Sequence, residues 1–258
     1  MKSQNIRIAP NALPKIFFDV LELVQNYFRV EVEGTENLPK RGRALLISNH
    51  SGCSGLDAAM LGYSAFQAVG RIPRILTLWP MFQLFPFLES TAIKLGLTPA
   101  SANMGLSVLK NNNITVVFPE GVRGSFKPTS QRYHLQPFRT GFLRLSLLTD
   151  SPIVPAVVIG AEESTINLGS IQFGSALKGL ALPIPLNFLP LPSKWKIRFL
   201  PPINLDGLSR RDISNRDKMH RYADKVRDKM QAAVDVELRK RKYVYFKRPQ
   251  LLELKTGS

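Results

Sequence analysis

Short runs suited to strands alternate with segments of helical periodicity along this chain. The strand-like runs lie at 29–34, 44–48, 114–118, 153–161 and 196–205. Apolar residues spaced three and four apart predict helices at 13–28, 57–66, 101–110, 141–150 and 214–242. Strands that alternate with helices are typical of an α/β fold. We therefore expect a single α/β domain with a largely parallel mixed sheet flanked by helices.

Three segments are more apolar than a soluble domain requires. Residues 13–28 form one broad apolar helical face, and residues 75–88 and 180–192 are apolar stretches interrupted by proline, so neither is one straight helix. Each segment fits buried core or loop, and each also fits a surface that enters a bilayer interface. The chain has no run of about 18 uninterrupted apolar residues and no visible secretory signal. We therefore expect membrane contact without a transmembrane helix.

The net charge of the chain predicts an anionic partner. The 258 residues are 44% hydrophobic, which excludes a disordered chain, and the net charge is +16. Residues 207–258 hold 15 Lys and Arg against 7 Asp and Glu, with the densest basic run at 239–242. A solvated helix and attraction to anionic lipids, roughly 1 kcal/mol per basic residue, explain this tail equally well. No zinc-finger, P-loop or aromatic RNA-binding motif is present, so we expect no nucleic-acid partner.

The first candidate for catalysis is His50, one of three histidines in the chain. It follows the predicted strand at 44–48 and opens a loop of small residues, which lets a substrate approach closely. Asp57 fits two compatible roles. It is suited to cap the following helix, and it is suited to hold one imidazole nitrogen so that the other acts as a base.

Three neighbours of His50 are candidate nucleophiles, namely Ser51, Cys53 and Ser54. No G-x-S-x-G elbow surrounds them. Direct attack by a hydroxyl that His50 deprotonates needs fewer groups, so we expect no covalent intermediate. Cys53 is the single cysteine, which excludes an intrachain disulfide and a Cys-rich zinc site.

A second polar segment, FPEGVRG at 118–124, directly follows the predicted strand at 114–118. Its glycines free the backbone to approach an anion, and Arg123 offers a planar fork of donors that matches phosphate. Glu120 fits either of two roles, orienting Arg123 or contacting a substrate hydroxyl. The alternative is an ordinary basic loop, which is the stronger interpretation for three cations further along: Lys127, Arg132 and Arg139. If the two strands are parallel neighbours, both polar segments meet at the sheet edge where such folds bind ligands.

Together the two segments resemble the glycerophospholipid acyltransferase superfamily of the 1-acylglycerol-3-phosphate type, whose members carry an N-H-x-x-x-x-D block and a later F-P-E-G-x-R block. The resemblance covers roughly residues 30–205 and includes a later strand with a proline, here Pro155. It implies a glycerolipid acyltransferase-like fold. It also implies five site residues: His50 as general base, Asp57 as its partner, and Glu120, Gly121 and Arg123 in the acceptor site.

Two features separate this chain from the common family pattern. Six residues rather than four lie between His50 and Asp57, as in a divergent N-H-S-G branch. The family's middle block contains an arginine that helps to hold the acceptor phosphate, and the nearest stretch here, 94–101, has none. A glycerol-phosphate acceptor therefore has less support than acyl transfer itself.

The resemblance implies an O-acyltransferase that moves a fatty acyl group from acyl-CoA or acyl-ACP to a hydroxyl of a lysophospholipid or related lipid. Neither a metal nor a bound cofactor is expected. We divide the chain into a membrane-associating amphipathic helix, 1–29, and an acyltransferase domain, 30–258. We expect a peripheral protein on the cytoplasmic face of a membrane that contains anionic lipids. The alternatives are a non-catalytic basic protein that binds or remodels lipid, and acylation of a non-glycerolipid acceptor.

Overall fold

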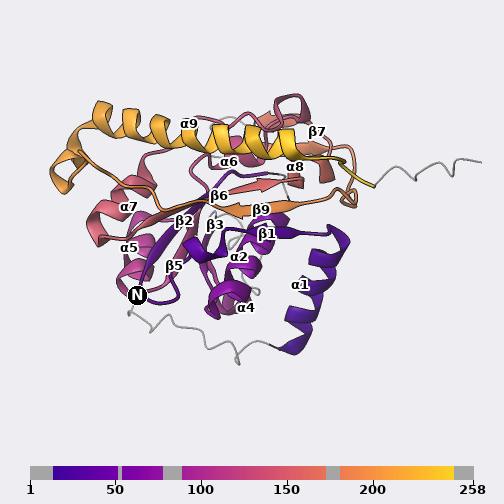
Figure 1. Ribbon diagram of the computed structural model, residues 1–258, viewed down its shortest axis with the longest axis horizontal. Coiled ribbons are helices and arrows are strands. Elements are labelled where there is room, and N and C mark those ends of the chain that lie inside the picture. Colours follow the sequence, from indigo (N-terminus) through magenta and orange to yellow (C-terminus); the bar gives the residue numbers. More distant parts are fainter. Residues whose placement is uncertain (1–13, 52–53, 78–88, 173–180, 247–258) are drawn as a thin grey trace, which may run out of the picture.

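The computed structural model describes residues 14–51, 54–77, 89–172 and 181–246, and a seven-stranded sheet forms its centre (Figure 1). The strand order is β1-β9-β6-β2-β5-β3-β4. β2 is parallel to both β5 and β6, whereas β9 is antiparallel to β6. The prediction of a largely parallel mixed sheet is therefore confirmed. The bounds of the strands are β1 (Glu31–Glu33), β2 (Ala44–Ser48), β3 (Arg74–Thr77), β4 (Leu97–Pro99), β5 (Ile114–Val117), β6 (Ile153–Ile159) and β9 (Lys196–Phe199).

Helices cover both faces of this sheet, because the central strands are apolar on both sides. Alternate residues of β2 point to opposite faces: Leu46 packs in the core formed with α1 and α2, and Ile47 in the core formed with α5, α7 and α9. The helices are α1 (Lys15–Tyr27), α2 (Leu56–Val69), α4 (Glu89–Lys94), α5 (Ala102–Lys110), α6 (Val122–Ser125), α7 (Gly141–Thr149), α8 (Ala161–Ser164) and α9 (Arg216–Lys240).

A second, two-stranded sheet lies outside the central one. It pairs β7 (Asn167–Gln172) with β8 (Ala181–Pro185) in antiparallel orientation. β8 contains two prolines, which an edge strand tolerates because its outer N–H groups have no ladder partner. The predicted apolar segment at 180–192 is thus strand β8 and the loop after it, with residue 180 outside the described part.

Several shorter elements differ from the sequence prediction. The apolar run at 75–88 begins inside strand β3, and its residues 78–88 lie outside the described ranges. The segment from FPEGVRG to Arg139, for which an ordinary basic loop was the alternative interpretation, contains α6 and a 3-10 helix, η4 (Thr129–Gln131). The late strand ends at Phe199, because two prolines follow Leu200. Further 3-10 helices are η2 (Thr35–Asn37) and η6 (Arg210–Ser214).

The amphipathic helix predicted at 13–28 is α1, whose exposed face carries Ile16, Val20 and Leu23. In the described part of the chain, neither α1 nor any other helix is both long and apolar enough to cross a bilayer.

Candidate active site

The two polar segments singled out in the sequence meet at one edge of the central sheet. β2 and β5 are adjacent parallel strands, with Ile47 opposite Val117. His50 and Glu120 follow these strands by a few residues, so both lie beyond the carboxyl ends of the two strands. The two segments are joined there, because the N–H of His50 donates a hydrogen bond of 2.9 Å to Oε1 of Glu120. The predicted meeting of the two segments is therefore observed.

His50 and Asp57 form a close pair. Nδ1 of His50 lies 2.6 Å from Oδ2 of Asp57, and the same oxygen accepts the N–H of Ser51 at 2.8 Å. A carboxylate only accepts, so Nδ1 carries the proton and Nε2 is the acceptor nitrogen. The imidazole also stacks on the ring of Phe118, with centroids 4.2 Å apart. The ring is thus fixed on two sides while its side chain stays 19% exposed.

The helix after this loop begins without the side chain of Asp57 as its cap. The residue before α2 is Gly55, in the left-handed conformation at φ 70°, and Asp57 lies in the first turn with its side chain directed to the His50 loop. The N-cap role predicted for Asp57 is therefore wrong. Its carboxylate is fully buried, and Oδ1 has no hydrogen-bond partner among the described residues.

The electrostatics of the pair raise the basicity of His50. Burial lowers the pKa of His50, but the charge and hydrogen bond of Asp57 oppose burial and outweigh it. Glu120 also raises this pKa, and Lys127 lowers it slightly. The net effect is a pKa above the ordinary value of 6.5. A base with a raised pKa takes a proton from a hydroxyl more readily than a free imidazole does.

Glu120 is a buried connector rather than a surface group. Its Oε1 accepts the N–H of His50, and its Oε2 accepts the N–H of Gln136 at 2.7 Å. These two contacts do not orient Arg123, which was one of the two roles predicted for Glu120. The residue Gly124 packs so close that an added Cβ would lie 2.6 Å from Cβ of Glu120, so only glycine fits there.

A buried network behind Glu120 was not predicted. Lys127 lies 3.8 Å from Glu120 and 2.8 Å from Oε1 of Glu162, whose Oε2 accepts the N–H of Tyr133 at 2.7 Å. Burial is the largest influence on Glu162 and raises its pKa to about 7, although Lys127 acts in the opposite direction. Lys127 is 35 residues from Glu162 in sequence, and nothing local signals this contact. The only sequence clue is the position of Glu162 directly after the strand predicted at 153–161.

The arginines are arranged differently from the sequence expectation. Arg123 is exposed and is not among the residues that line the cavity beside His50, whereas Arg139 and Arg144 do line it. The guanidinium of Arg139 lies 3.6 Å from the position that a Cβ on Gly121 would take, and Gly121 has a positive φ of 60°. The positive φ favours glycine at 121, whereas a Cβ there would only make ordinary van der Waals contact with Arg139. The binding of an acceptor phosphate by Arg123 stays a prediction.

Of the three candidate nucleophiles, Cys53 lies outside the described residues. Ser51 is buried, and its hydroxyl has no hydrogen-bond partner within the described ranges. Ser54 lines the cavity beside His50. The described part of the chain contains no group of three or more His, Cys, Asp or Glu side chains that could hold a metal ion.

Asn49 fixes the start of the His50 loop. Its side-chain amide donates to the carbonyl of Val158 at 3.0 Å and accepts the N–H of Val158 at 2.8 Å. These two bonds replace a backbone ladder between the end of β2 and strand β6. The main chain at His50 is thereby free to leave the sheet and bond to Glu120.

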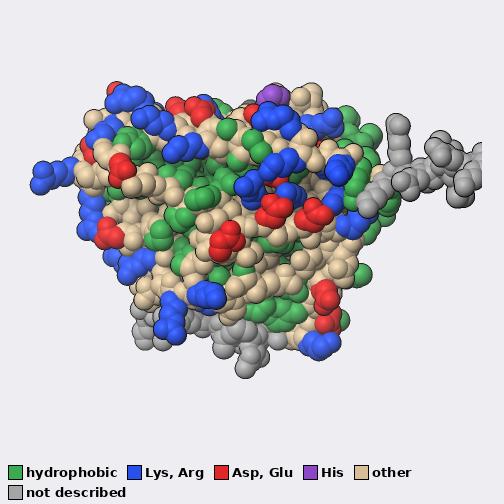
Figure 2. All heavy atoms as spheres, in the orientation of Figure 1, with side chains coloured by type: hydrophobic (Ala, Val, Ile, Leu, Met, Phe, Trp, Pro, Cys, Tyr) green, Lys and Arg blue, Asp and Glu red, His purple; other side chains and the backbone are tan. Residues whose placement is uncertain are grey.

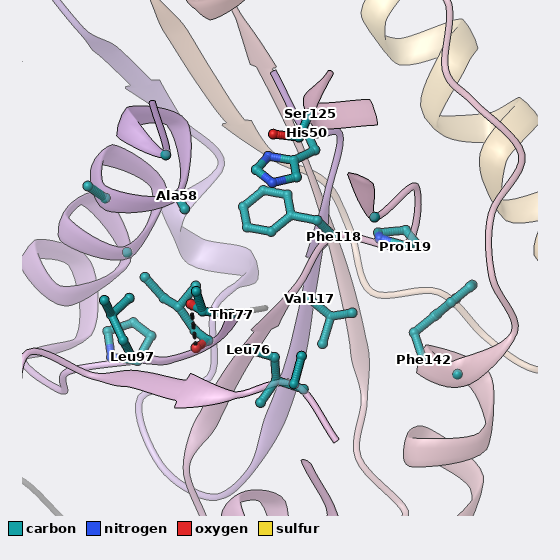
Figure 3. A pocket seen from close by; sticks show the side chains of 18 of the residues that line it. His50, Ala58, Leu76, Thr77, Leu97, Val117, Phe118, Pro119, Ser125 and Phe142 are labelled. Atoms are coloured by element: carbon teal, nitrogen blue, oxygen red, sulfur yellow. Dashed lines mark hydrogen bonds between the residues drawn. The ribbon is translucent and has the colours of Figure 1, made fainter. Parts of the chain in front are cut away.

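A mainly apolar cavity of about 750 Å³ extends from His50 into the molecule. Figure 3 shows the rings of His50 and Phe118 at one end, with Leu76, Val117 and Leu97 further along. α1 and α2 contribute much of the wall: Phe17, Phe18, Leu21, Ala58, Tyr63 and Phe66. A volume of this size suits a small molecule or an extended apolar chain.

A histidine with a carboxylate partner, beside an apolar cavity at the end of a parallel sheet, suits acid–base chemistry on an apolar substrate. The sequence profile of the acyltransferase family matches residues 29–159, which is half of the chain. The chain belongs to this family. The matched span contains His50, Asp57 and Glu120.

Individual relatives agree with this membership. An uncharacterised protein of Mycobacterium tuberculosis is 35% identical over 234 residues, which cover 86% of this chain and 65% of that protein. A 1-acyl-sn-glycerol-3-phosphate acyltransferase of Limnanthes alba is 28% identical over 197 residues, covering 74% of this chain and 60% of that enzyme. The chain thus spans less than two thirds of the length of these relatives.

A solved structure supports the fold. The crystal structure of the 1-acyl-sn-glycerophosphate acyltransferase PlsC from Thermotoga maritima matches with a TM-score of 0.55 and 19% sequence identity. The match covers 86% of this chain and 81% of PlsC. The acyltransferase-like fold predicted from the sequence is therefore confirmed.

Proposed function

We propose that this protein transfers a fatty acyl group from an acyl thioester, acyl-CoA or acyl-ACP, to a hydroxyl of a lysophospholipid or related lipid. The observation that carries this proposal is the His50–Asp57 pair at the end of an apolar cavity of about 750 Å³. The cavity suits an acyl chain, and the pair suits activation of a hydroxyl. The proteins named as 1-acyl-sn-glycerol-3-phosphate acyltransferases among the relatives add support.

In this mechanism Nε2 of His50 accepts the proton of the acceptor hydroxyl as its oxygen attacks the thioester carbonyl. The carbon–sulfur bond then breaks, and the imidazolium returns the proton to the departing thiolate. Asp57 holds the Nδ1–H and stabilises the imidazolium, so it acts as partner rather than as proton acceptor. A positioned base of this kind contributes about 10²- to 10⁴-fold to the rate. The reaction uses the thioester as co-substrate and needs no bound cofactor or metal.

The acceptor is proposed to lie along the Glu120 segment. Gly121 lines the cavity, and Arg139 and Arg144 add positive charge to its wall. Arg123, next to this wall in sequence, is proposed to bind a phosphate of the acceptor from the solvent side. A phosphate there suits a lysophospholipid whose acyl chain enters the cavity.

We also propose that the protein is peripheral to the cytoplasmic face of a membrane. α1 has 13 residues, about 20 Å of helix, which is short of a hydrocarbon core of about 30 Å. Its exposed apolar face suits the interface plane, and the basic segment at 207–258 suits anionic lipid.

The test is a turnover assay with the full chain. Labelled acyl-CoA and acyl-ACP donors are incubated with a lipid extract, and the products are identified by mass spectrometry. We expect free thiol and an acylated lipid, both lost in His50→Ala. The matched control is His220→Ala, because His220 is exposed on α9 and far along the chain from the site. Lipid binding without thiol release from any donor would instead support a non-catalytic lipid-binding protein.

A further inference from the structure

The sheet of β7 and β8 turns its apolar side chains outward. In residues 182–188 large apolar side chains alternate with proline or asparagine. Successive residues of a strand point to opposite faces of the sheet. The outward set includes Leu186, 63% exposed, and Phe188, 93% exposed. We call the following residues the apolar sheet face: Ile171, Leu182, Ile184, Leu186 and Phe188, with Ile171 directly opposite Leu182.

The opposite side of this sheet packs on the protein, so its orientation is fixed. Asn167, buried at the start of β7, donates from its side chain to the carbonyls of Phe126 and Lys127, both at 3.0 Å. The polar side of β7 is therefore anchored to the segment after the Glu120 loop. Rotation of the apolar sheet face into the core would break these bonds.

The loop that carries Phe188 is held by hydrogen bonds. The side chain of Asn187 accepts the N–H of Ile166 at 2.8 Å and donates to the carbonyls of Ser164 and Leu189 at 3.0 and 2.7 Å. Phe188 and Leu189 thus project from an ordered loop. Large apolar side chains that a fold holds in water in this way mark a surface for a partner.

This surface continues onto α1. The hydroxyl of Tyr27, at the end of α1, donates to the carbonyl of Pro190 at 2.5 Å. Figure 1 shows α1 and β7 at the same side of the molecule. One face of α1 exposes Ile16, Val20 and Leu23, and its other face lines the cavity beside His50. The apolar sheet face therefore adjoins the helix that forms the cavity wall.

The charges around this surface favour an anionic and apolar partner. Residues 164–193 contain no Asp or Glu. The guanidinium of Arg29 borders the loop, donating to the carbonyls of Pro192 and Tyr245 at 2.6 and 2.5 Å. Figure 2 shows hydrophobic side chains along the margin near β7, next to Lys and Arg side chains. The described part of residues 164–193 thus forms an apolar surface without carboxylates and with Arg29 at its border, which fits a bilayer interface that contains anionic lipid. The adjoining exposed side of α1 carries charges of both signs beside its apolar residues, namely Lys15, Asp19 and Glu22.

We propose that the apolar sheet face, with Leu189 and the exposed face of α1, is the surface on which the protein docks to an anionic lipid bilayer. Phe188 and Leu189 enter the interface, and Arg29 lies at headgroup level. The inference deepens the proposed function, because it names where a lipid acceptor reaches the cavity. Vesicle binding tests the docking surface, so the outcome of that test is independent of whether the protein catalyses acyl transfer.

The first test is sedimentation of the full chain with vesicles of phosphatidylcholine and phosphatidylglycerol. We expect the double variant Phe188→Ser/Leu189→Ser to bind at least about tenfold more weakly, because each large side chain withdraws from the interface. The binding that the wild type retains at high salt should fall most in this variant, because salt screens only the ionic part and the variant removes two of the apolar side chains. A matched pair controls for the chemistry: Ile184→Ser should weaken binding and Ile93→Ser should not, although the two isoleucines are 40% and 39% exposed.

The second test reports depth. In Phe188→Trp the new indole should shift its emission to the blue on vesicle binding and be quenched by brominated lipid, whereas Ile93→Trp should respond to neither. Equal vesicle binding by wild type and the double variant would overturn the inference. So would a wild-type dimer that the double variant dissociates without any change in vesicle binding, since the face would then join two copies.

Turnover with a soluble short-chain donor and acceptor separates the two proposals. Lost vesicle binding with retained turnover in the double variant supports docking and leaves the proposed function standing. Vesicle binding that depends on Phe188 in a protein that never releases thiol supports docking and removes the proposed function.

Discussion

Replacing Asp57 by asparagine tests the charge of the catalytic pair separately from its geometry. Oδ2 accepts both the Nδ1–H of His50 and the N–H of Ser51, and Oδ1 has no partner among the described residues. An asparagine amide is favoured in one orientation, with its oxygen in the place of Oδ2 and its NH₂ group at the Oδ1 position, where the described residues offer no partner. The reverse orientation would oppose its NH₂ group to the N–H of Ser51, leaving buried donors unpaired at about 1–3 kcal/mol. Asp57→Asn should therefore keep the position and the tautomer of His50.

The loss of charge sets the expected magnitude. A hydrogen bond to a charged group contributes about 1.5–3 kcal/mol, against about 0.5–1.5 kcal/mol between neutral groups. The imidazolium formed during the reaction loses this difference and also the attraction of the carboxylate. We expect kcat/KM to fall about 10²-fold, equal to about 2.7 kcal/mol of transition-state stabilisation.

The direction of the pH dependence is a second, independent readout. In the proposed mechanism neutral His50 is the base, so the rate should fall as the pH drops through its pKa. Asp57 is the main group that raises this pKa against burial. In Asp57→Asn burial should prevail, and the acidic limb of kcat/KM should move to lower pH.

The assay is thiol release as a function of pH, with far-UV circular dichroism to verify that the variant is folded. Wild-type kcat/KM in a folded Asp57→Asn protein would refute the role of Asp57 in raising the basicity of His50. An acidic limb of kcat/KM that moves to higher pH in Asp57→Asn would refute the claim that Asp57 raises the pKa of His50.

The remaining predictions concern Arg123 and Glu162. Arg123→Lys should raise the KM for a phosphate-bearing acceptor about tenfold and leave the donor KM unchanged, because the planar fork is lost; an effect on the donor alone, seen in initial-rate kinetics, would assign Arg123 to the donor. Glu162 has a folded-state pKa of about 7, above its ordinary 4.5, so the folded state binds more protons between these values. The free energy of unfolding should therefore fall by up to about 3 kcal/mol as the pH rises through this window, and Glu162→Gln should flatten that slope in denaturant titrations. A slope that persists in Glu162→Gln would assign it to other groups.

The strands that carry the site are predictable because their signal is local. Residues 44–48 and 114–118 are short apolar runs, and each ends directly in a polar segment. Buried parallel strands read as continuous apolar runs, so their ends also give the position of the ligand edge. The pattern of apolar and polar residues is therefore enough to predict that His50, Asp57 and Glu120 lie in one region.

Other features depend on contacts that the local sequence does not contain. β3 begins with Arg74, which is buried with its guanidinium bonded to the carbonyl of Ile93, so its sequence does not look like a buried strand. Lys127 and Glu162 meet only because α6 and the end of β6 come together in the fold. The alternation at 182–188 is visible in the sequence, but the side that faces outward is decided by the anchoring of Asn167.

The amide of Asn49 has a consequence for moving this site into another protein. Its two bonds to Val158 make the neighbouring strand β6 part of the geometry, although β6 contributes no reacting atom to the proposed chemistry. A transplanted loop from Asn49 to Asp57 would therefore keep its shape only beside a strand with a free N–H and C=O at the matching height. Aspartate and serine at 49 lack the amide's fixed planar pair of one acceptor and a donor group, so neither restores both bonds. Because Phe118 and Glu120 also hold His50, the smallest portable unit is the loop with β2, β6 and the end of β5, not the loop alone.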